Sequence, residues 1–129
     1  MRAPCPAWLD LVIVPVLTVV EPARDSLNPE LSLLGVLLNI ADMRTVHSRE
    51  AKALLRERFG EQVFGTVVRA SIAYAESAER AVSILDYRPD LGVDYLAVAD
   101  ELLKRLGQDK PRQRVSELLR AAQPAQASA

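Results

Sequence analysis

Three short segments rich in apolar residues constrain the fold of this chain most strongly: Leu11–Val14, Leu33–Asn39 and Val63–Val68. Runs without apolar–polar alternation are typical of strands that are buried on both faces, as in a parallel sheet. Parallel strands need long crossover connections, and segments with helical periodicity lie between or after these runs. The pattern therefore predicts an α/β fold, with a parallel sheet of about three strands and flanking helices. Three buried strands make a thin sheet, so we expect them to be part of a larger one.

Helical periodicity is clearest where Ala51, Leu54, Leu55 and Phe59 share one face. Ser48 is expected to cap this helix at its N-terminus, and Gly60 is expected to end it in the left-handed conformation. We expect further helical segments over 71–80 (a loop and a short helix), 90–106 and 112–122.

The formal net charge is only −1, but basic residues gather in two places, between Arg44 and Arg58 and between Lys104 and Arg120. Such clusters are consistent with solvated helix faces, or with a surface that contacts phosphates without recognising base sequence. Cys5 is the single cysteine, which fits a reducing cytoplasm. The apolar stretch 7–20 is too short to span a bilayer and is interrupted by charge and proline, so we expect no membrane association.

The motifs of nucleotide and metal chemistry are missing from the sequence. There is no G-x-x-x-x-G-K-[ST] loop, and the five glycines are too scattered to surround a phosphate: Gly35, Gly60, Gly65, Gly92 and Gly107. His47 and Cys5 are each single and far apart, which predicts no metal site. We assign no catalytic residue and expect no cofactor for this chain alone.

Several motifs resemble, in order and spacing, the C-terminal half of the ParA/Soj-type partition ATPases, the MinD/ParA group of deviant Walker proteins. Asn28–Leu31, followed by a run containing Gly35, is similar to the N-P-x-L-x-[IL]-x-G segment of that family. Residues 10–15 are similar to its D-x-V-I-x-P strand, and residues 42–45 to its D-x-R-T turn. Residues 59–64 are similar to its F-G-x-x-V-F segment, and residues 87–102 to its final helix. The resemblance covers roughly Asp10 to Leu106.

The resemblance implies a partial P-loop NTPase fold whose N-terminal half, with the Walker A loop, is missing. It implies that residues 1–107 form the C-terminal portion of a ParA-like domain, with an amphipathic helix and a disordered tail at 108–129. Family members use ATP and Mg²⁺, bind DNA non-specifically and respond to a ParB-type partner. They act in chromosome or plasmid partitioning in the cytoplasm, where DNA binding would place this chain on the nucleoid.

The resemblance also assigns roles to three residues. Asn39 falls where the family contacts the adenine base, although an amide there can equally cap a strand end. Arg44 matches an arginine implicated in DNA contact, and its alternative role is a salt bridge to Asp42. The family's usual I-P-R-N pattern corresponds to Val68–Ser71 here, so its proline is missing and its arginine is moved by one position. Arg69 is therefore a candidate to replace the phosphate contact of the family's arginine.

These observations predict a truncated ParA-like partition protein that is not an ATPase by itself. The alternatives are a non-catalytic module that binds DNA or a full-length ParA, and a gene remnant without function.

Overall fold

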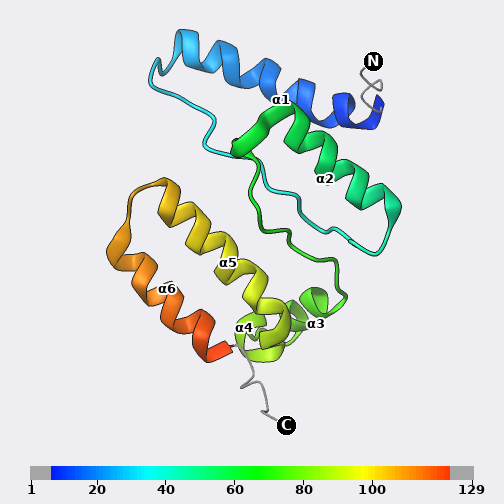
Figure 1. Ribbon diagram of the computed structural model, residues 1–129, viewed down its shortest axis with the longest axis vertical. Coiled ribbons are helices and arrows are strands. Elements are labelled where there is room, and N and C mark those ends of the chain that lie inside the picture. Colours follow the sequence, from blue (N-terminus) through cyan, green and yellow to red (C-terminus); the bar gives the residue numbers. More distant parts are fainter. Residues whose placement is uncertain (1–6, 123–129) are drawn as a thin grey trace.

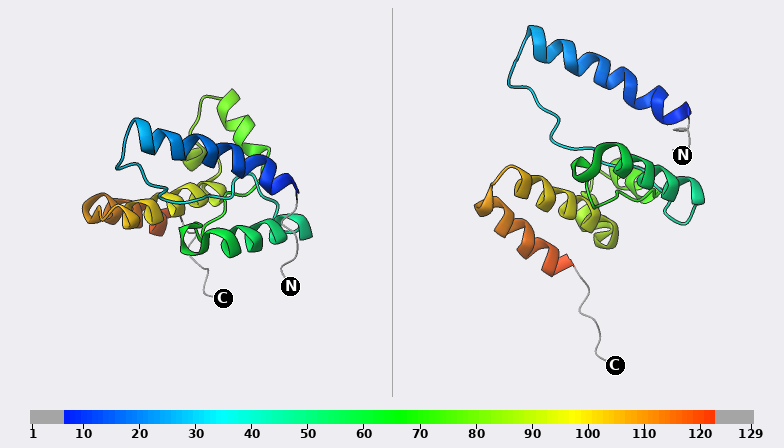
Figure 2. Two further views of the ribbon diagram at one scale, coloured as in Figure 1. Left: turned by 90° about the horizontal axis from the view of Figure 1, so that it is seen from above. Right: turned by 45° about the horizontal axis from the view of Figure 1, so that its top comes forward.

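The computed structural model describes residues 7–122, and helices dominate that part of the chain. Its elements are α1 (Ala7–Ser26), α2 (Val46–Phe59), the short 3₁₀ helix η1 (Gly60–Gln62), α3 (Ala73–Glu79), α4 (Ile84–Tyr87), α5 (Pro89–Arg105) and α6 (Asp109–Ala122). In Figure 1, α1 lies across the top, and α5 and α6 form an antiparallel pair below it. Figure 2 gives two further views of this arrangement. Cys5 and the predicted tail beyond Gln123 lie outside the described residues.

The prediction of an α/β fold with a three-stranded parallel sheet is wrong: residues 7–122 contain no strand and no sheet. The first predicted strand, Leu11–Val14, lies inside α1. There Ile13 and Leu17 are spaced like one helix face, and both contribute to an apolar lining beside Phe59. The helix forms although Pro15 and Pro22 each remove a backbone N–H donor from it.

The other two predicted strands are extended segments that run side by side, without forming a ladder. Two isolated parallel bridges join them, Val36 with Val63 and Ala41 with Arg69. Because α2 carries the chain back between the two segments, they run in the same direction. The register shifts between the bridges, since Ala41 is five residues after Val36 whereas Arg69 is six after Val63.

Glu101 of α5 explains the interruption. Its carboxylate accepts hydrogen bonds from the backbone N–H groups of Gly65 (3.0 Å) and Thr66 (2.8 Å), and from the Thr66 hydroxyl (2.7 Å). A continuous parallel ladder would direct the Thr66 N–H to the neighbouring segment. Pairing resumes only at Val68, whose N–H donates to the carbonyl of Leu38.

The two extended segments lie between α2 and α5. On the α2 side, Leu55 and Val63 are buried against each other, and Val36, Leu38 and Phe59 pack around them. On the α5 side, the Arg105 guanidinium lies 4.2 Å from the centre of the Phe64 ring. Val63 and Phe64 are neighbours in the chain and face opposite helices, as successive side chains of an extended backbone do.

Glycines with positive φ follow two of the helices, and Gly60 is one of them, although its ψ of −128° lies outside the left-handed helical region that was predicted. Gly60 follows α2 with φ of 59°, and Gly107 follows α5 with φ of 68°. The predicted N-cap of α2 shifts by one turn, because Thr45 caps the helix by accepting a hydrogen bond from the backbone N–H of Ser48 at 3.2 Å. The predicted helices at 90–106 and 112–122 are confirmed as α5 and α6.

Candidate nucleic-acid interface

The residues that the sequence singled out lie near one edge of the paired extended segments. The bridge between Ala41 and Arg69 places the residues that follow each segment beside each other. Asn39 comes just before this bridge and Arg44 just after it. The fold therefore brings Asn39, Arg44 and Arg69 to a common region of the surface.

Asn39 is exposed, and its side-chain oxygen accepts a hydrogen bond from the N–H of Ile40 at 3.0 Å. Ile40 has a φ of 53°, which is unusual for a β-branched residue, and its side chain is 75% exposed. The local hydrogen bond fits a residue that ends an extended segment. The contact of Asn39 with an adenine base stays a prediction.

Arg44 forms a salt bridge with Asp42, which is one of the two roles that the sequence predicts for it. Its Nε and Nη2 donate to the two carboxylate oxygens of Asp42 at 2.9 and 3.0 Å. These hydrogen bonds lower the pKa of Asp42 and raise that of Arg44. The Arg44 side chain nevertheless remains 91% exposed, so water screens this pair strongly.

Arg69 is held more firmly, by a carboxylate from another element. Its Nε and Nη2 donate to Asp94 of α5 at 2.9 and 3.2 Å, and Nη2 also donates to the Asp90 carbonyl at 2.7 Å. The hydrogen bond to Asp94 raises the pKa of Arg69 above its ordinary value. Sequence analysis did not identify Asp94, because nothing in the sequence shows that residues 69 and 94 meet.

A row of cations on α2, formed by Arg49, Lys52 and Arg56, contrasts with these two arginines. Their spacing of three and four residues places them on one face of the helix. Within residues 7–122, none of the three forms an ion pair; Lys52 makes only a long contact of 3.5 Å with the carbonyl of Gly65. These three residues of the first basic cluster therefore form a cationic surface without ion pairs among the described residues, here called the α2 row.

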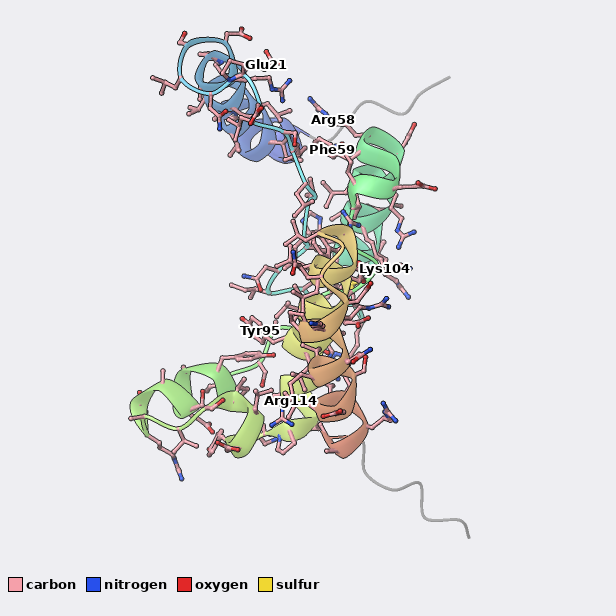
Figure 3. All side chains as sticks on the ribbon, turned by 90° about the vertical axis from the view of Figure 1, so that its left-hand side faces the viewer. Glu21, Arg58, Phe59, Tyr95, Lys104 and Arg114 are labelled. Atoms are coloured by element: carbon pink, nitrogen blue, oxygen red, sulfur yellow. The ribbon has the colours of Figure 1, made fainter. Side chains whose placement is uncertain are left out.

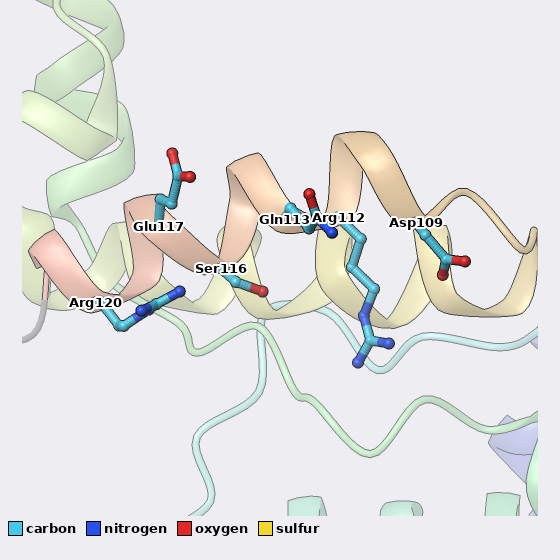
Figure 4. Close-up of a pocket in the computed structure, with 6 residues that line it drawn as sticks. All are labelled: Asp109, Arg112, Gln113, Ser116, Glu117 and Arg120. Carbon is cyan, nitrogen blue, oxygen red and sulfur yellow. The ribbon is translucent and has the colours of Figure 1, made fainter.

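The second basic cluster is balanced by acids. Figure 4 shows the outer face of α6, where Arg112 and Glu117 point to opposite sides of the helix. The hollow there has a volume of about 570 Å³ and is lined by Asp109, Arg112, Gln113, Ser116, Glu117 and Arg120. Arg112 is also paired with Asp100 of α5 at 2.9 Å. With two acids and two arginines in its lining, this hollow does not favour an anion.

A smaller apolar hollow lies between α1 and the start of the first extended segment. It has a volume of about 220 Å³ and is lined by Ile13, Val16, Leu17, Leu33, Gly35, Val36 and Phe59. Figure 3 shows Arg58 and Phe59 at the end of α2 that is closest to α1. With no charged side chain in its lining, it has nothing to hold a phosphate.

Among the described residues, no group of three or more His, Cys, Asp or Glu side chains could hold a metal ion. None of the helices in that same part of the chain is both long and apolar enough to span a bilayer.

Comparison with known proteins identifies relatives that work in chromosome partitioning. The chain is 35% identical over 92 residues to the chromosome-partitioning ATPase Soj of Thermus thermophilus, a match of 70% of this chain and 37% of the relative. It is 29% identical over 99 residues to the chromosome partitioning protein ParA of Myxococcus xanthus, covering 75% of this chain and 35% of the relative. The ParA of Caulobacter vibrioides is 30% identical over 88 residues, or 67% of this chain and 33% of the relative. No protein-family model matches the chain.

The resemblance found in the sequence motifs is therefore confirmed: the chain is related to ParA/Soj-type partition proteins. It spans about a third of the length of these relatives.

Proposed function

We propose that this chain takes part in DNA segregation by contacting DNA phosphates through the α2 row. Three observations support the proposal. Arg49, Lys52 and Arg56 share a helix face, none of them is neutralised by an ion pair within residues 7–122, and the relatives are named for chromosome partitioning. Cations of this kind bind the DNA backbone without recognising base sequence. Such binding would associate the chain with the nucleoid.

Among residues 7–122 the α2 row has no ion pair, and this carries the proposal, because an arginine already bonded to a carboxylate contributes little net attraction to a phosphate. Arg44 and Arg69 are both bonded in this way. The α2 row is therefore the better candidate for DNA, although sequence resemblance favours Arg44.

Fluorescence anisotropy with a labelled duplex of random sequence tests this. The logarithm of the binding constant should fall with the logarithm of salt concentration, by about 0.9 for each phosphate contacted. Lys52→Gln together with Arg56→Gln should reduce that slope by about 1.8. Arg114→Gln is the matched control, since Arg114 is an exposed arginine on α6, and its slope should equal that of the parent protein. Absence of binding at low salt would refute the proposal.

We further propose that this chain alone does not hydrolyse ATP. The proposal is supported by the sequence, whose scattered glycines provide no phosphate loop. Release of phosphate from ATP and Mg²⁺, measured with and without DNA, should not exceed the rate of a blank. ATP binding that is lost in Asn39→Ala would, in contrast, support the predicted base contact.

A protein partner is the second candidate function. It is favoured by exposed apolar side chains near the edge of the paired segments: Ile40 (75%), Val46 (60%) and Ile72 (76%). Exposed apolar side chains that lie together on a surface mark protein-interaction sites. A full-length ParA or a ParB-like protein from the same genome should co-elute with this chain, and Ile40→Ser with Ile72→Ser should abolish that association.

A further inference from the structure

Asp94 is a mostly buried carboxylate of α5 that accepts three hydrogen bonds from one arginine of a different segment, Arg69. The backbone N–H of Arg69 donates to Oδ2 at 3.1 Å, Nε to the same oxygen at 2.9 Å, and Nη2 to Oδ1 at 3.2 Å. The Asp94 side chain is only 12% exposed, whereas that of Arg69 is 49% exposed. The pair joins α5 to the end of the second extended segment.

The hydrogen bonds to Asp94 occupy the Nε and Nη2 edge of the Arg69 guanidinium, an edge that could otherwise bind a phosphate. Arginine recognises phosphate most strongly through two parallel N–H groups. On Arg69 one such pair, Nε and Nη2, is bound to Asp94, and Nη2 is also bound to the Asp90 carbonyl. Asp94 also cancels the positive charge of Arg69 at close range.

The pair of Arg44 with Asp42 is a useful contrast. Both residues belong to one turn, and their side chains are 91% and 38% exposed, so water and salt compete with their contact. Asp94 comes from a different element and is mostly buried, so salt competes with its contact much less.

We propose that Asp94 determines whether Arg69 is available to phosphate, by holding its guanidinium away from DNA. This inference rests on the proposed DNA contact through the α2 row. In the parent protein Arg69 makes no contact with a DNA phosphate. When the charge of Asp94 is removed, the Arg69 guanidinium is released and makes one additional phosphate contact.

The experiment measures binding to a labelled random duplex over a salt series, for the intact chain and two variants. Asp94→Asn keeps the shape of the side chain and removes its charge, so the slope against salt should steepen by about 0.9. Between about 50 and 200 mM salt, the affinity of this variant should fall roughly threefold to fourfold more than that of the parent. Arg69→Gln with Asp94→Asn removes both charges together, and its slope should return to the parent value.

Each outcome is decisive. An unchanged slope in Asp94→Asn, while the parent binds DNA, overturns the inference and leaves the proposed function standing. Binding by Asp94→Asn but not by the parent overturns the proposed function and supports the inference. If neither binds, both are refuted. If circular dichroism shows that Asp94→Asn is unfolded, Arg69→Gln alone decides, because it leaves Asp94 in place: a slope about 0.9 shallower than that of the parent shows that Arg69 already contacts phosphate and overturns the inference.

Discussion

Arg105 shows how a single side chain connects three parts of this chain. From the end of α5 its guanidinium donates to the carbonyls of Leu34 (3.0 Å) and Gln62 (2.7 Å). It also donates to the carbonyls of Glu61 (3.0 Å) and Val63 (3.2 Å). The planar group satisfies the backbone at the start of both extended segments, a task that suits arginine rather than lysine.

Arg105→Lys is therefore expected to destabilise the protein. An ammonium group has three donors and cannot reach four carbonyls in one plane, so about 2 kcal/mol of the free energy of unfolding should be lost. Urea denaturation measures this change. Arg114→Lys, at an exposed position on α6, should change the stability by less than about 0.5 kcal/mol.

Gly35 is required because Arg105 and Phe64 come so close to it. A Cβ at position 35 would lie 2.5 Å from Arg105 Nη1, 2.6 Å from Phe64 and 2.8 Å from the carbonyl of Gln62. Gly35→Ala should therefore cost about 1 to 3 kcal/mol in thermal or urea unfolding. At Gly65 the nearest atom is 3.3 Å away, so Gly65→Ala should cost less; an equal cost would contradict the packing at position 35.

Among the elements, long periodic segments were predictable from sequence and short apolar runs were not. The helices around Leu55 and Leu102 repeat their apolar residues over several turns, and both are present as α2 and α5. Leu11–Val14 is a run of four, which cannot be assigned to strand or helix from periodicity alone. In the structure Ile13 of this run packs, together with Val36 and Phe59, around Leu55 and Val63, all of them distant from it in sequence.

The pairing of side chains between elements was likewise not predictable. Glu101 and Arg105 lie four residues apart on α5 and approach to 3.9 Å. Their main contacts, however, are with the backbone of residues 61–66 and Leu34. Asp100 lies four residues before Lys104 on the same helix, yet its ion pair is with Arg112 of α6 at 2.9 Å.

The attachment of α5 through Glu101 should depend on pH. Burial alone would raise the pKa of Glu101, but hydrogen bonds from Thr66 and from the Gly65 N–H outweigh it and lower the pKa below its ordinary value of 4.5. A lowered pKa means that the ionised group stabilises the fold above about pH 4.5. That contribution is lost as the pH falls through the lower, folded-state pKa.

Glu101→Gln should therefore be less stable than the parent at neutral pH, by about 1 to 2 kcal/mol. The difference should shrink when urea denaturation is repeated at an acidic pH below the lowered pKa of Glu101, where the parent carboxylate is protonated. Glu57→Gln is a control on the exposed face of α2. A difference of the same size at both pH values would show that the charge of Glu101 does not stabilise the fold.

For the whole molecule, the distribution of charge matters more than its sum. The net charge of −1 gives no attraction for DNA, and the arginines near the segment edge are bonded to carboxylates. Only a local surface can then attract phosphates, and the α2 row is such a surface. We expect added salt to weaken DNA binding steeply, with no preference for base sequence in a competition between unrelated duplexes.

The most direct test of the DNA interface is a backbone NMR titration of the intact protein with a short duplex of random sequence. The account predicts that amide shift changes centre on Arg49, Lys52 and Arg56, and that they disappear when salt is added. Shift changes confined to α6, or none at low salt, would contradict it.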